Sequence, residues 1–464
     1  MTAARSLASI WAAKGTAFAS RALKRGGGTA ASGLVGTWLQ PKLIEELASQ
    51  LGNGCVIVTG TNGKTTTSLL LSDSARAAGL RPLANGSGSN LVRGIASTLA
   101  LAAGTDGRLH DAENRIGVFE VDEATVPLVL PVLQPRAIVF TNLFRDQLDR
   151  YGEVEAVASL WREMLRTAPQ GLRLVLNADD PAVASLGDGR AGVTSFGVED
   201  RKLDRGAPDH AADALSCVCG ARLEYSAAFF GHMGHWRCPA CGRERPKPEI
   251  AARLVNLKDG RSVRFQLAVD GEKGMVEMPL GGLYNVYNAL AAAAAVQALG
   301  LPSASSIQAI EGVAAAFGRQ EAFEVEGKRV ELLLGKNPAG LNQVLSTLML
   351  DPARRTALFV LNDGIADGRD ISWVWDADFE VAAGKLERAI TSGTRAAEMA
   401  LRLKYAEWDE RTIEVDPEIR RALDRALALT RPGECLTVVP TYTAMLAVRD
   451  LLAKRSGKEP FWRA

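Results

Sequence analysis

Residues 56–67, which read Val-Ile-Val-Thr-Gly-Thr-Asn-Gly-Lys-Thr-Thr-Thr, combine an apolar strand, a glycine turn and a helix start. Phosphate groups bind well at such a junction, because glycines let backbone N–H groups approach the oxygens and the helix N-terminus carries partial positive charge. The ammonium of Lys64 can neutralise the β- and γ-phosphates, and the hydroxyl of Thr65 or Thr66 can bind Mg²⁺. The sequence therefore predicts a nucleotide site formed by Gly60, Thr61, Asn62, Gly63, Lys64, Thr65 and Thr66.

This loop departs from the general phosphate-loop pattern G-x-x-x-x-G-K-[ST], because Val58 stands where the first glycine would fall. A Gly-Lys-Thr tripeptide also occurs by chance in ordinary turns. The apolar strand before the loop and the threonine-rich helix start after it nevertheless favour nucleotide binding over an ordinary turn.

A carboxylate follows the next strand-like run, in the segment Phe119-Glu120-Val-Asp122-Glu123. A carboxylate at the carboxyl end of a strand faces the ligand crevice of an open parallel sheet. We therefore expect Glu120 to face that crevice, with a merely solvated strand end as the alternative.

Four of the six cysteines form two pairs, Cys217-Val-Cys219-Gly and Cys238-Pro-Ala-Cys241-Gly. Thiolates at such spacing converge on one tetrahedral zinc ion, and a glycine after the second cysteine permits the tight turn. The first pair is one residue short of C-x-x-C, so His232 and His235 are alternative ligands, and a reduced cysteine loop is the alternative to a metal site. Four protein ligands would make the zinc structural. Cys55 and Cys435 lie in apolar runs and are expected to be buried strand residues.

The elements that must position these residues alternate between short apolar strands and helical patterns from about residue 50 to 200. This alternation predicts a parallel sheet covered by helices on both faces. Residues 204–249 interrupt the pattern and resemble an inserted module; the first architecture is expected to resume after it and to end with the alanine-rich helix 288–299. A second series of strands and helices begins near residue 320. The strand-like runs are 56–59, 116–119, 137–140, 172–176, 330–334, 357–361 and 436–439.

The bulk composition limits the class of protein. A chain of 464 residues is expected to form two or three domains, which we place at 1–49 (helical), 50–315 and 316–464. With 54 basic and 53 acidic residues, a nucleic-acid surface is not expected. The N-terminal apolar run is too short for a signal peptide and is interrupted by Lys14, so we expect an amphipathic helix in a cytoplasmic protein.

The loop sequence Gly-Thr-Asn-Gly-Lys-Thr resembles the phosphate loop of the Mur ligases and the folylpolyglutamate synthases. Further motifs follow in the order in which this family has them. The resemblance implies an α/β fold with a central ATPase domain and a C-terminal Rossmann-like domain, with ATP and Mg²⁺ as cofactors. It implies that Thr65 and Glu120 hold Mg²⁺ and that Arg319 reaches the γ-phosphate. The motifs that carry it are Thr141-Asn142, Asp146-Gln147-Leu148-Asp149, Asn177-Ala-Asp179-Asp180-Pro181, Gly282-Leu-Tyr284-Asn285-Val-Tyr-Asn288 and Gly318-Arg319, with Asn142, Asn285 and Asn288 expected at the nucleotide.

The chain also departs from the common Mur pattern. Gln147 replaces a histidine that binds a second Mg²⁺, and no lysine occurs between Lys64 and Lys202 where many relatives carry a carbamylated one. About fifty residues before the phosphate loop are too few for the family's uridine-binding domain. The segment 333–340, Leu-Leu-Gly-Lys-Asn-Pro-Ala-Gly, lacks the family's aspartate that contacts an incoming amino acid.

The cysteine insert directs the resemblance to one branch of the family, the MurT-type ligase subunits. That resemblance implies ATP-dependent conversion of the α-carboxyl of D-isoglutamate in the lipid II stem peptide into D-isoglutamine, through an acyl-phosphate and with ammonia from a GatD-type glutamine amidotransferase. It implies that an aspartate near residue 363 meets this partner; we match it to Asp363, with Asp367 and Asp370 as alternatives. None of the four histidines lies in the C-terminal region, which agrees with a glutaminase on a separate chain.

Two other functions remain open from the sequence. A folylpolyglutamate-synthase-like enzyme would add glutamate to a soluble acid, and a non-catalytic scaffold would bind ATP only to dock a partner. A lipid-linked substrate, in contrast, would bring the protein to the inner face of the membrane.

Overall fold

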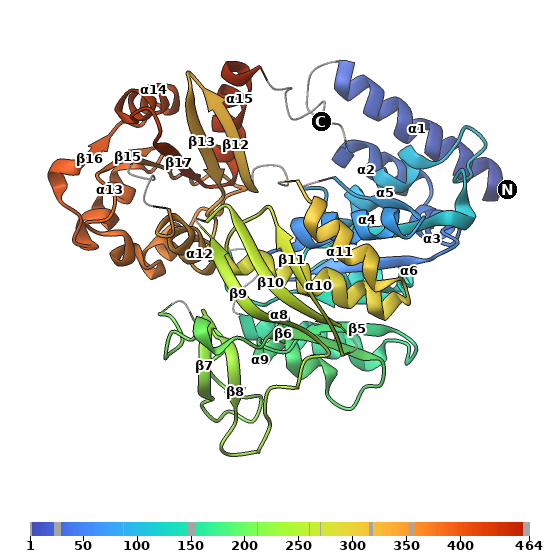
Figure 1. Cartoon of the computed structure of the whole chain (residues 1–464). Helices are drawn as coiled ribbons and strands as arrows, with labels where there is room; N and C mark the ends of the chain where they lie inside the picture. The colour runs from blue at the N-terminus through green and yellow to red at the C-terminus, as the bar shows by residue number, and fades with distance from the viewer. Residues whose placement is uncertain are drawn as a thin grey trace.

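The strands predicted around the phosphate loop build one nine-stranded sheet in the order β11-β10-β9-β6-β5-β4-β1-β3-β2 (Figure 1). The computed structural model of the chain describes residues 2–22, 29–86, 88–146, 154–210, 212–258, 260–269, 271–314, 319–351 and 356–457. The strands of this sheet are β1 Cys55–Thr59, β2 Arg81–Ala84, β3 Arg115–Glu120, β4 Ala137–Phe140, β5 Arg173–Asn177, β6 Val193–Val198, β9 Ile250–Lys258, β10 Ser262–Val269 and β11 Glu272–Met278.

Strands β1, β3, β4 and β5 pair only in parallel, as their apolar runs predict. Strands β2 and β6, which the sequence pattern did not predict, join the same sheet in parallel. After residue 249 the chain returns to the same sheet, as expected, since β9 pairs in parallel with β6 and α10 covers one face. The parallel pattern does not continue, however, because β9, β10 and β11 form an antiparallel ribbon on the sheet's edge. The connections within this ribbon are too short for the crossover helix that parallel strands need. Buried residues alternate with more exposed ones along β10, and partly buried residues alternate with exposed ones along the second half of β9, as in a sheet with one solvated face.

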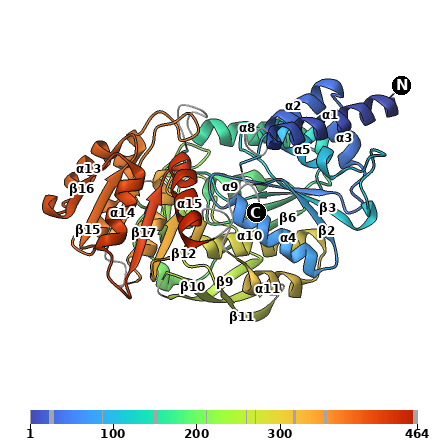
Figure 2. The same cartoon turned by 90° about the horizontal axis from the view of Figure 1, so that it is seen from above.

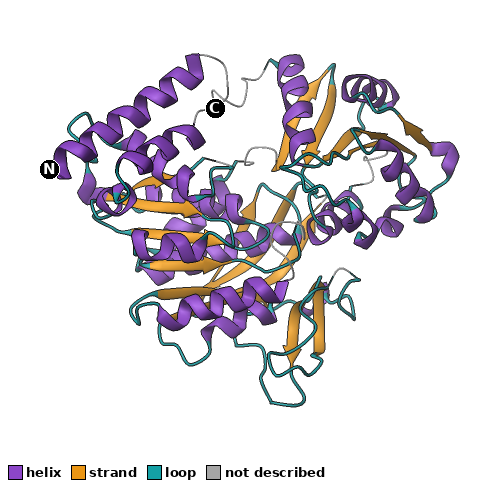
Figure 3. Cartoon of the chain, turned by 180° about the vertical axis from the view of Figure 1, so that it is seen from behind, coloured by secondary structure: helices purple, strands orange, loops and turns teal. Residues whose placement is uncertain are grey.

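Helices cover both faces of this sheet, and Figure 3 shows the strands between two helical layers. Val56 and Val58 of β1 pack into the core beneath α4, α10 and α11. Ile57 points the other way, into the core beneath α3, α5, α6 and α8. The helices of this part are α1 Thr2–Ala22, α2 Thr29–Leu39, α3 Leu43–Ala48, α4 Lys64–Ala77, α5 Val92–Ala102, α6 Val126–Leu133, α8 Val154–Thr167, α9 Pro181–Ala184, α10 Leu283–Leu299 and α11 Ser303–Gly312.

A second sheet of six strands follows, in the order β12-β13-β17-β14-β15-β16, and lies beside the first (Figure 2). Its strands run parallel except for the β12–β13 hairpin. Cys435 is buried in β17 as Cys55 is in β1, and burial raises the pKa of Cys55 to about 12. The elements of this part are β12 Arg319–Val325, β13 Lys328–Leu333, α12 Pro338–Leu348, β14 Thr356–Val360, β15 Arg388–Ser392, α13 Ala396–Tyr405, β16 Ile413–Val415, α14 Ile419–Leu429, β17 Cys435–Pro440 and α15 Tyr442–Ser456.

The N-terminal helix pair α1 and α2 packs against α5. Ser32 and Ser97 share a buried hydrogen bond of 2.7 Å between their hydroxyls. A Cβ on Gly33 would lie 1.7 Å from the carbonyl oxygen of Arg93, so only glycine allows α2 to approach α5 this closely. Within the described residues, no helix is long and apolar enough to cross a bilayer.

The fully buried carboxylate of Asp179, which follows β5, connects three parts of the structure. These are the nine-stranded sheet, the segment between β6 and β9, and helix α10. Asp179 accepts hydrogen bonds from Arg245 Nε (2.6 Å), the Tyr287 hydroxyl (2.6 Å) and the Val198 N–H (2.8 Å). Burial first, and then the charge of Asp179, raise the pKa of Tyr287 well above its usual value. The carboxylate is therefore satisfied only while Arg245 and α10 remain in place.

We predict that Arg245→Ala lowers the free energy of unfolding by about 3–5 kcal/mol, because it leaves Asp179 charged, buried and unpaired. Thermal and urea unfolding of the purified chain would measure this change. Arg237→Ala is the matched control, since its ion pair with Glu224 is exposed and is expected to contribute about 1 kcal/mol or less. Equal stability of the two variants would contradict the assigned role of Asp179.

Candidate nucleotide site and cysteine cluster

The phosphate loop lies at the carboxyl end of β1, between the carboxyl ends of β3 and β4. Its two glycines have positive φ angles, +126° at Gly60 and +87° at Gly63, and α4 begins directly after them. A Cβ on Gly63 would lie 2.0 Å from Asn288 Oδ1, so any side chain there would collide with α10. The loop conformation therefore depends on glycine at Gly63, as the sequence pattern suggested.

Lys64 and Glu120 are both buried beside this loop. Lys64 Nζ donates to the carbonyl oxygens of Gly60 and Thr61 and forms an ion pair of 3.2 Å with Glu123. The Thr65 hydroxyl donates to Glu120 Oε2 at 2.9 Å. The structure thus brings Lys64, Thr65 and Glu120 together at the start of α4.

The charges around Lys64 keep it protonated. Burial opposes the ammonium form, but the carboxylates of Glu123, Glu120, Asp122 and Asp146 outweigh this effect and raise the pKa of Lys64 above its usual value. Burial raises the pKa of Glu123, while the neighbouring Lys64 acts in the opposite direction. A positive charge is therefore held where phosphate oxygens would lie.

Asn142, which follows β4, fixes the middle of the phosphate loop. Its side-chain Oδ1 accepts from the Asn62 N–H at 2.9 Å, and its Nδ2 donates to the Asn62 carbonyl at 3.1 Å. The hydroxyl of Thr61 donates to the Phe144 carbonyl at 2.9 Å and accepts from the Phe144 N–H at the same distance. The two segments thus hold each other in one conformation.

An open cavity of about 770 Å³ adjoins the loop, between the nine-stranded sheet and the second sheet. Asn285 and Asn288 of α10 line it and are joined by a hydrogen bond of 3.0 Å from Asn288 Nδ2 to Asn285 Oδ1. Aromatic and aliphatic side chains form much of the rest, which suits a nucleobase. The lining residues are Asn62, Gly63, Thr66, Asn142, Phe230, Leu280, Tyr284, Asn285, Tyr287, Asn288, Gln320, Leu333, Leu334, Ala339, Gly340, Gln343 and Val344.

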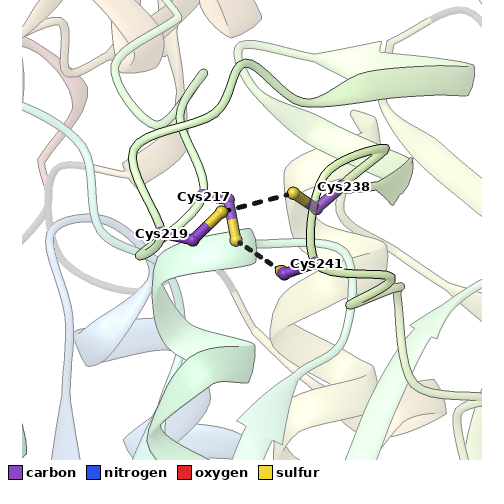
Figure 4. A group of neighbouring side chains, drawn as sticks. All are labelled: Cys217, Cys219, Cys238 and Cys241. Atoms are coloured by element: carbon purple, nitrogen blue, oxygen red, sulfur yellow. Dashed lines mark hydrogen bonds between the residues drawn. The ribbon is translucent and has the colours of Figure 1, made fainter.

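The four cysteines of the insert form a second group of ligands (Figure 4). Cys217 and Cys241 Sγ atoms are 3.6 Å apart, those of Cys219 and Cys238 are 3.5 Å apart, and all four lie within 4.8 Å of one another. A zinc ion with four thiolates at about 2.3 Å would separate sulfur atoms by about 3.8 Å. The backbone N–H of Cys241 lowers the pKa of Cys238 to about 6, which favours the thiolate. The donor set and its size therefore fit zinc.

The two histidines between the cysteine pairs do not join this group. His232 is fully buried, with Nε2 3.3 Å from Asp180 Oδ2 and Nδ1 accepting from the Asp213 N–H. His235 Nε2 lies 2.9 Å from the Val198 carbonyl. The prediction of these histidines as alternative ligands is wrong, because the hairpin directs both rings away from the cysteines and toward the sheet.

The hairpin of strands β7 Glu224–Phe230 and β8 Met233–Arg237 links the cysteine group to the nucleotide cavity. Phe230 at its tip lines the cavity and stacks on Phe144, with ring centroids 5.8 Å apart. Trp236, near the cysteines, donates from Nε1 to the Ala178 carbonyl at 3.0 Å. Displacement of the cysteine loops would therefore move one wall of the cavity.

Comparison with known proteins decides the family. The description "Mur ligase middle domain" matches residues 58–234, and "MurT ligase C-terminal" matches residues 334–445. The chain is 33% identical over 438 residues to the MurT subunit of the glutamine-hydrolysing lipid II isoglutaminyl synthase of Staphylococcus aureus strain COL, covering 94% of both chains. It is 32% identical over 434 residues to the corresponding Streptococcus pneumoniae subunit, covering 93% of both. This chain belongs to the MurT family of Mur ligases.

Solved structures of Mur-type ligases share the fold of this MurT-family chain. The pseudomurein peptide ligase type C of Methanothermus fervidus superposes with a TM-score of 0.65 at 24% identity, over 86% of this chain and 78% of that one. MurF of Thermotoga maritima, solved in complex with ADP, gives a TM-score of 0.63 at 13% identity, over 90% and 84%. The overall α/β architecture is therefore that of the Mur ligases.

In the MurT C-terminal region, the three candidate aspartates differ in how they are engaged. Asp363 is partly exposed and accepts from the Thr394 hydroxyl and Arg395 Nε, both at 2.8 Å. The Thr394 bond first and Arg395 second hold its pKa below the usual range. Asp367 is buried and accepts from the Thr443 N–H at 2.7 Å, whereas Asp370 accepts from the Ser372 N–H in a surface turn. Asp363 and Asp370 are both accessible, but only Asp363 is held by two side chains from another segment, Thr394 and Arg395.

Sequence reasoning missed the contacts that the second sheet makes with the phosphate loop. Lys336 forms an ion pair with Asp146, and Asn337 Nδ2 donates to Asn62 Oδ1 at 3.1 Å. The sequence carries one local signal here, since Asn337 before Pro338 is a typical helix start, and Asn337 does cap α12. The long-range partners could not be read from it.

Some of the predicted motif residues cannot be placed in the structure. Gln147, Leu148, Asp149 and Gly318 lie outside the described residues. The backbone of Arg319 begins β12 and pairs with Leu333, at the junction of the two sheets, but its side chain lies outside the description. The proposed contact of Arg319 with the γ-phosphate therefore stays a prediction.

We predict that Asn142→Ala weakens ATP binding about 10- to 100-fold, because the N–H and carbonyl of Asn62 lose their fixed partners and the loop loses its conformation. Equilibrium binding of a fluorescent ATP analogue would measure the effect. Asn256→Ala, an exposed position on β9, serves as the matched control and should leave affinity unchanged. Unaltered affinity of Asn142→Ala would show that this contact does not organise the site.

Proposed function

We propose that this chain is the ATP-dependent ligase subunit of a lipid II isoglutaminyl synthase. It converts the α-carboxyl of D-isoglutamate in the lipid II stem peptide into a carboxamide. The observation that carries the proposal is the meeting of Lys64, Thr65 and Glu120 at the start of α4, beside a cavity lined by Asn285, Asn288 and apolar side chains. The MurT subunits that the chain resembles over more than nine-tenths of its length support the choice of substrate.

Thr65 and Glu120 offer two adjacent oxygen ligands at the carboxyl edge of the sheet, a donor set that suits Mg²⁺. When bound there, Mg²⁺ would neutralise charge on the β- and γ-phosphates. We propose one Mg²⁺ ion at this position. A second is not proposed, because no lysine lies between Lys64 and Lys202 to be carbamylated.

The proposed reaction has two steps. An acceptor carboxylate oxygen attacks the γ-phosphorus of ATP, the bond from that phosphorus to the bridging oxygen breaks, and ADP leaves with the oxygen. Lys64, already protonated and directed into the loop, stabilises the charge on the transferring phosphoryl group, and Arg319 is proposed to assist from β12. Ammonia then attacks the carbonyl carbon of the acyl-phosphate. The C–O bond breaks, and phosphate departs with a proton from the nitrogen.

The nucleotide would be held along its length by separate elements. The backbone from Gly60 to Thr66 cradles the phosphates, and Asn142 keeps that backbone in place. Asn285 and Asn288 of α10 face the cavity on the adenine side. We propose that residues 50–315 form the ATPase domain, that 316–464 form the second domain, and that 1–49 form a helical segment packed on the first.

A separate glutaminase is proposed to supply the ammonia, as the words "glutamine-hydrolyzing" and "subunit" in the relatives' names suggest for those proteins. Asp363 is the proposed contact for a GatD-type partner, because it is fixed by Thr394 and Arg395 yet remains accessible. Because ATP is the co-substrate, we place the reaction in the cytoplasm, where the lipid II stem peptide would be reached at the inner membrane face.

We further propose that Cys217, Cys219, Cys238 and Cys241 hold one structural zinc ion in a ribbon inserted at about residues 204–249. The size of the thiolate group supports zinc, and the four protein ligands leave no position for substrate. The ion would keep the β7–β8 hairpin, and with it Phe230, in place at the cavity.

The function is tested by incubating the chain and its candidate glutaminase with lipid II, ATP and glutamine. We expect a mass decrease of the stem peptide that corresponds to replacement of OH by NH₂. Lys64→Ala should lower the rate at least about 100-fold, because the charge of the transferred phosphoryl group loses its main cation. Lys258→Ala, whose ammonium forms an exposed pair on β9, is the control and should behave as wild type. ATP turnover that requires added glutamate, without amidation, would favour the glutamate-adding alternative.

The same assay examines Asp363. Asp363→Ala is expected to lose amidation with glutamine but to keep it with ammonium chloride, since only delivery of ammonia by the partner is affected. Asp370→Ala should retain both. Loss of both activities in Asp363→Ala would place this aspartate in the ligase chemistry instead.

The zinc proposal predicts one zinc ion per purified chain, measured by atomic emission. Cys219→Ser should lose the metal and also weaken ATP binding, because the hairpin that carries Phe230 loses its anchor. Cys435→Ala, a buried cysteine in β17, should keep both. A metal-free chain with normal ATP affinity would refute this role.

A further inference from the structure

The outward sides of the N-terminal helix pair expose four large apolar side chains. Trp11 and Phe18 of α1 are 55% and 76% exposed, and Leu34 and Trp38 of α2 are 61% and 77% exposed. We call these four residues the N-terminal face. Figures 1 and 2 both show α1 and α2 side by side on the outside of the molecule.

These side chains are exposed although both helices already bury another of their sides against the protein. Trp11 and Phe18 are seven residues apart, so they lie on one side of α1. The opposite side is fully used, because Ile10, Ala13 and Ala17 are buried. The same holds for α2, where Ser32 and Gly33 pack on α5 while Leu34 and Trp38 point outward. Each helix therefore has one buried side and a second, separate apolar side.

The charged residues at the N-terminus of the chain are all basic. Residues 1–44 contain no acidic residue, whereas the whole chain carries 54 basic and 53 acidic residues. The rest of the chain is therefore net negative. Two of these basic side chains, Arg5 and Lys42, lie exposed on the described helices and their connection. The basic residues of the segment are Arg5, Lys14, Arg21, Lys24, Arg25 and Lys42.

Exposed tryptophan, phenylalanine and leucine in an N-terminal segment whose only charges are basic match the surface of an anionic bilayer. Indole rings favour the level of the lipid headgroups, and basic residues near an anionic leaflet each contribute about 1 kcal/mol of attraction. Helices that bind in the membrane plane have this composition. The complete lack of acidic residues gives the segment a charge that complements anionic headgroups.

The helices that carry the N-terminal face are connected to the phosphate end of the site through α5. Helix α2 packs on α5, and α5 follows the loop that contains Asn85. Asn85 exchanges two hydrogen bonds of 2.8 Å with the backbone of Glu120, the proposed Mg²⁺ ligand. A surface held by α1 and α2 is thus one helix away from the position where the acceptor carboxylate must meet the γ-phosphate.

We propose that the N-terminal face docks the protein on an anionic phospholipid surface and so holds the site beside its lipid-linked acceptor. This inference rests on the proposed function for its purpose, but the binding itself does not require catalysis. The four apolar side chains enter the headgroup layer, and the exposed Arg5 and Lys42 pair with lipid phosphates. The occupant of this surface is a membrane rather than a second protein.

The binding is tested by flotation of the full chain with vesicles of phosphatidylcholine containing about one third phosphatidylglycerol. We expect wild type to bind these vesicles, to bind phosphatidylcholine alone weakly, and to release as salt rises. Trp11→Ser/Trp38→Ser should lose at least about tenfold in vesicle affinity with an unchanged melting temperature. The control Leu128→Ser/Leu401→Ser removes two exposed apolar side chains from α6 and α13 and should bind as wild type. Equal binding by the tryptophan variant would overturn the proposal.

An activity measurement separates this proposal from the proposed function. With its glutaminase, Trp11→Ser/Trp38→Ser should amidate vesicle-borne lipid II more slowly than wild type, yet should amidate a lipid-free acceptor with the same stem peptide at the wild-type rate. A wild-type enzyme that amidates neither acceptor would refute the proposed function, while flotation still decides whether the face binds lipid. A tryptophan variant that binds vesicles normally but no longer binds the glutaminase would make the face a protein interface and overturn the docking proposal.

Discussion

Two adjacent buried carboxylates at the end of β5 hold the parts of the nucleotide site in register. Asp179 binds Arg245 and, through the Tyr287 hydroxyl, helix α10. Asp180 accepts from the Leu143 N–H at 2.8 Å and contacts His232 of the hairpin. Because Asn142 precedes Leu143, and Tyr287 lies between the cavity residues Asn285 and Asn288, two parts of the cavity wall depend on one short turn. Burial makes these charges costly to leave unpaired, and this cost ties the hairpin, α10 and the phosphate loop into one arrangement.

Several buried charges also lie close together at the phosphate loop, and they determine the protonation state of Lys64. Lys64 lies among four carboxylates that raise its pKa, so it stays cationic although it is buried. In this structure its partners are the loop carbonyls and Glu123. Phosphate oxygens of a bound nucleotide would replace the carbonyls without any need to recruit a new charge. The site is thus prepared for a strongly anionic ligand, as a ligase that begins with phosphoryl transfer requires.

Local signals were readable from the sequence, and contacts between distant segments were not. The phosphate loop, the parallel strands β1, β3, β4 and β5 and the cysteine pairs each depend on a few neighbouring residues, and each is present in the structure. The ribbon β9–β11 was not predicted, because partly exposed antiparallel strands contain no continuous apolar run. The pairing of Lys336 with Asp146, and the reach of Phe230 into the cavity, arise only when separate units pack together. Two histidines near the cysteines suggested ligands, but the hairpin register directs them elsewhere.

The central claim is that ATP activates the acceptor carboxylate as an acyl-phosphate. The most direct measurement uses lipid II whose D-isoglutamate α-carboxyl carries ¹⁸O, incubated with ATP, the chain and an ammonia source, followed by mass analysis of the inorganic phosphate. The account predicts that each amide formed releases a phosphate containing one oxygen from the carboxylate, since the C–O bond breaks when ammonia attacks. Amide formation with no ¹⁸O in the phosphate would contradict the claim.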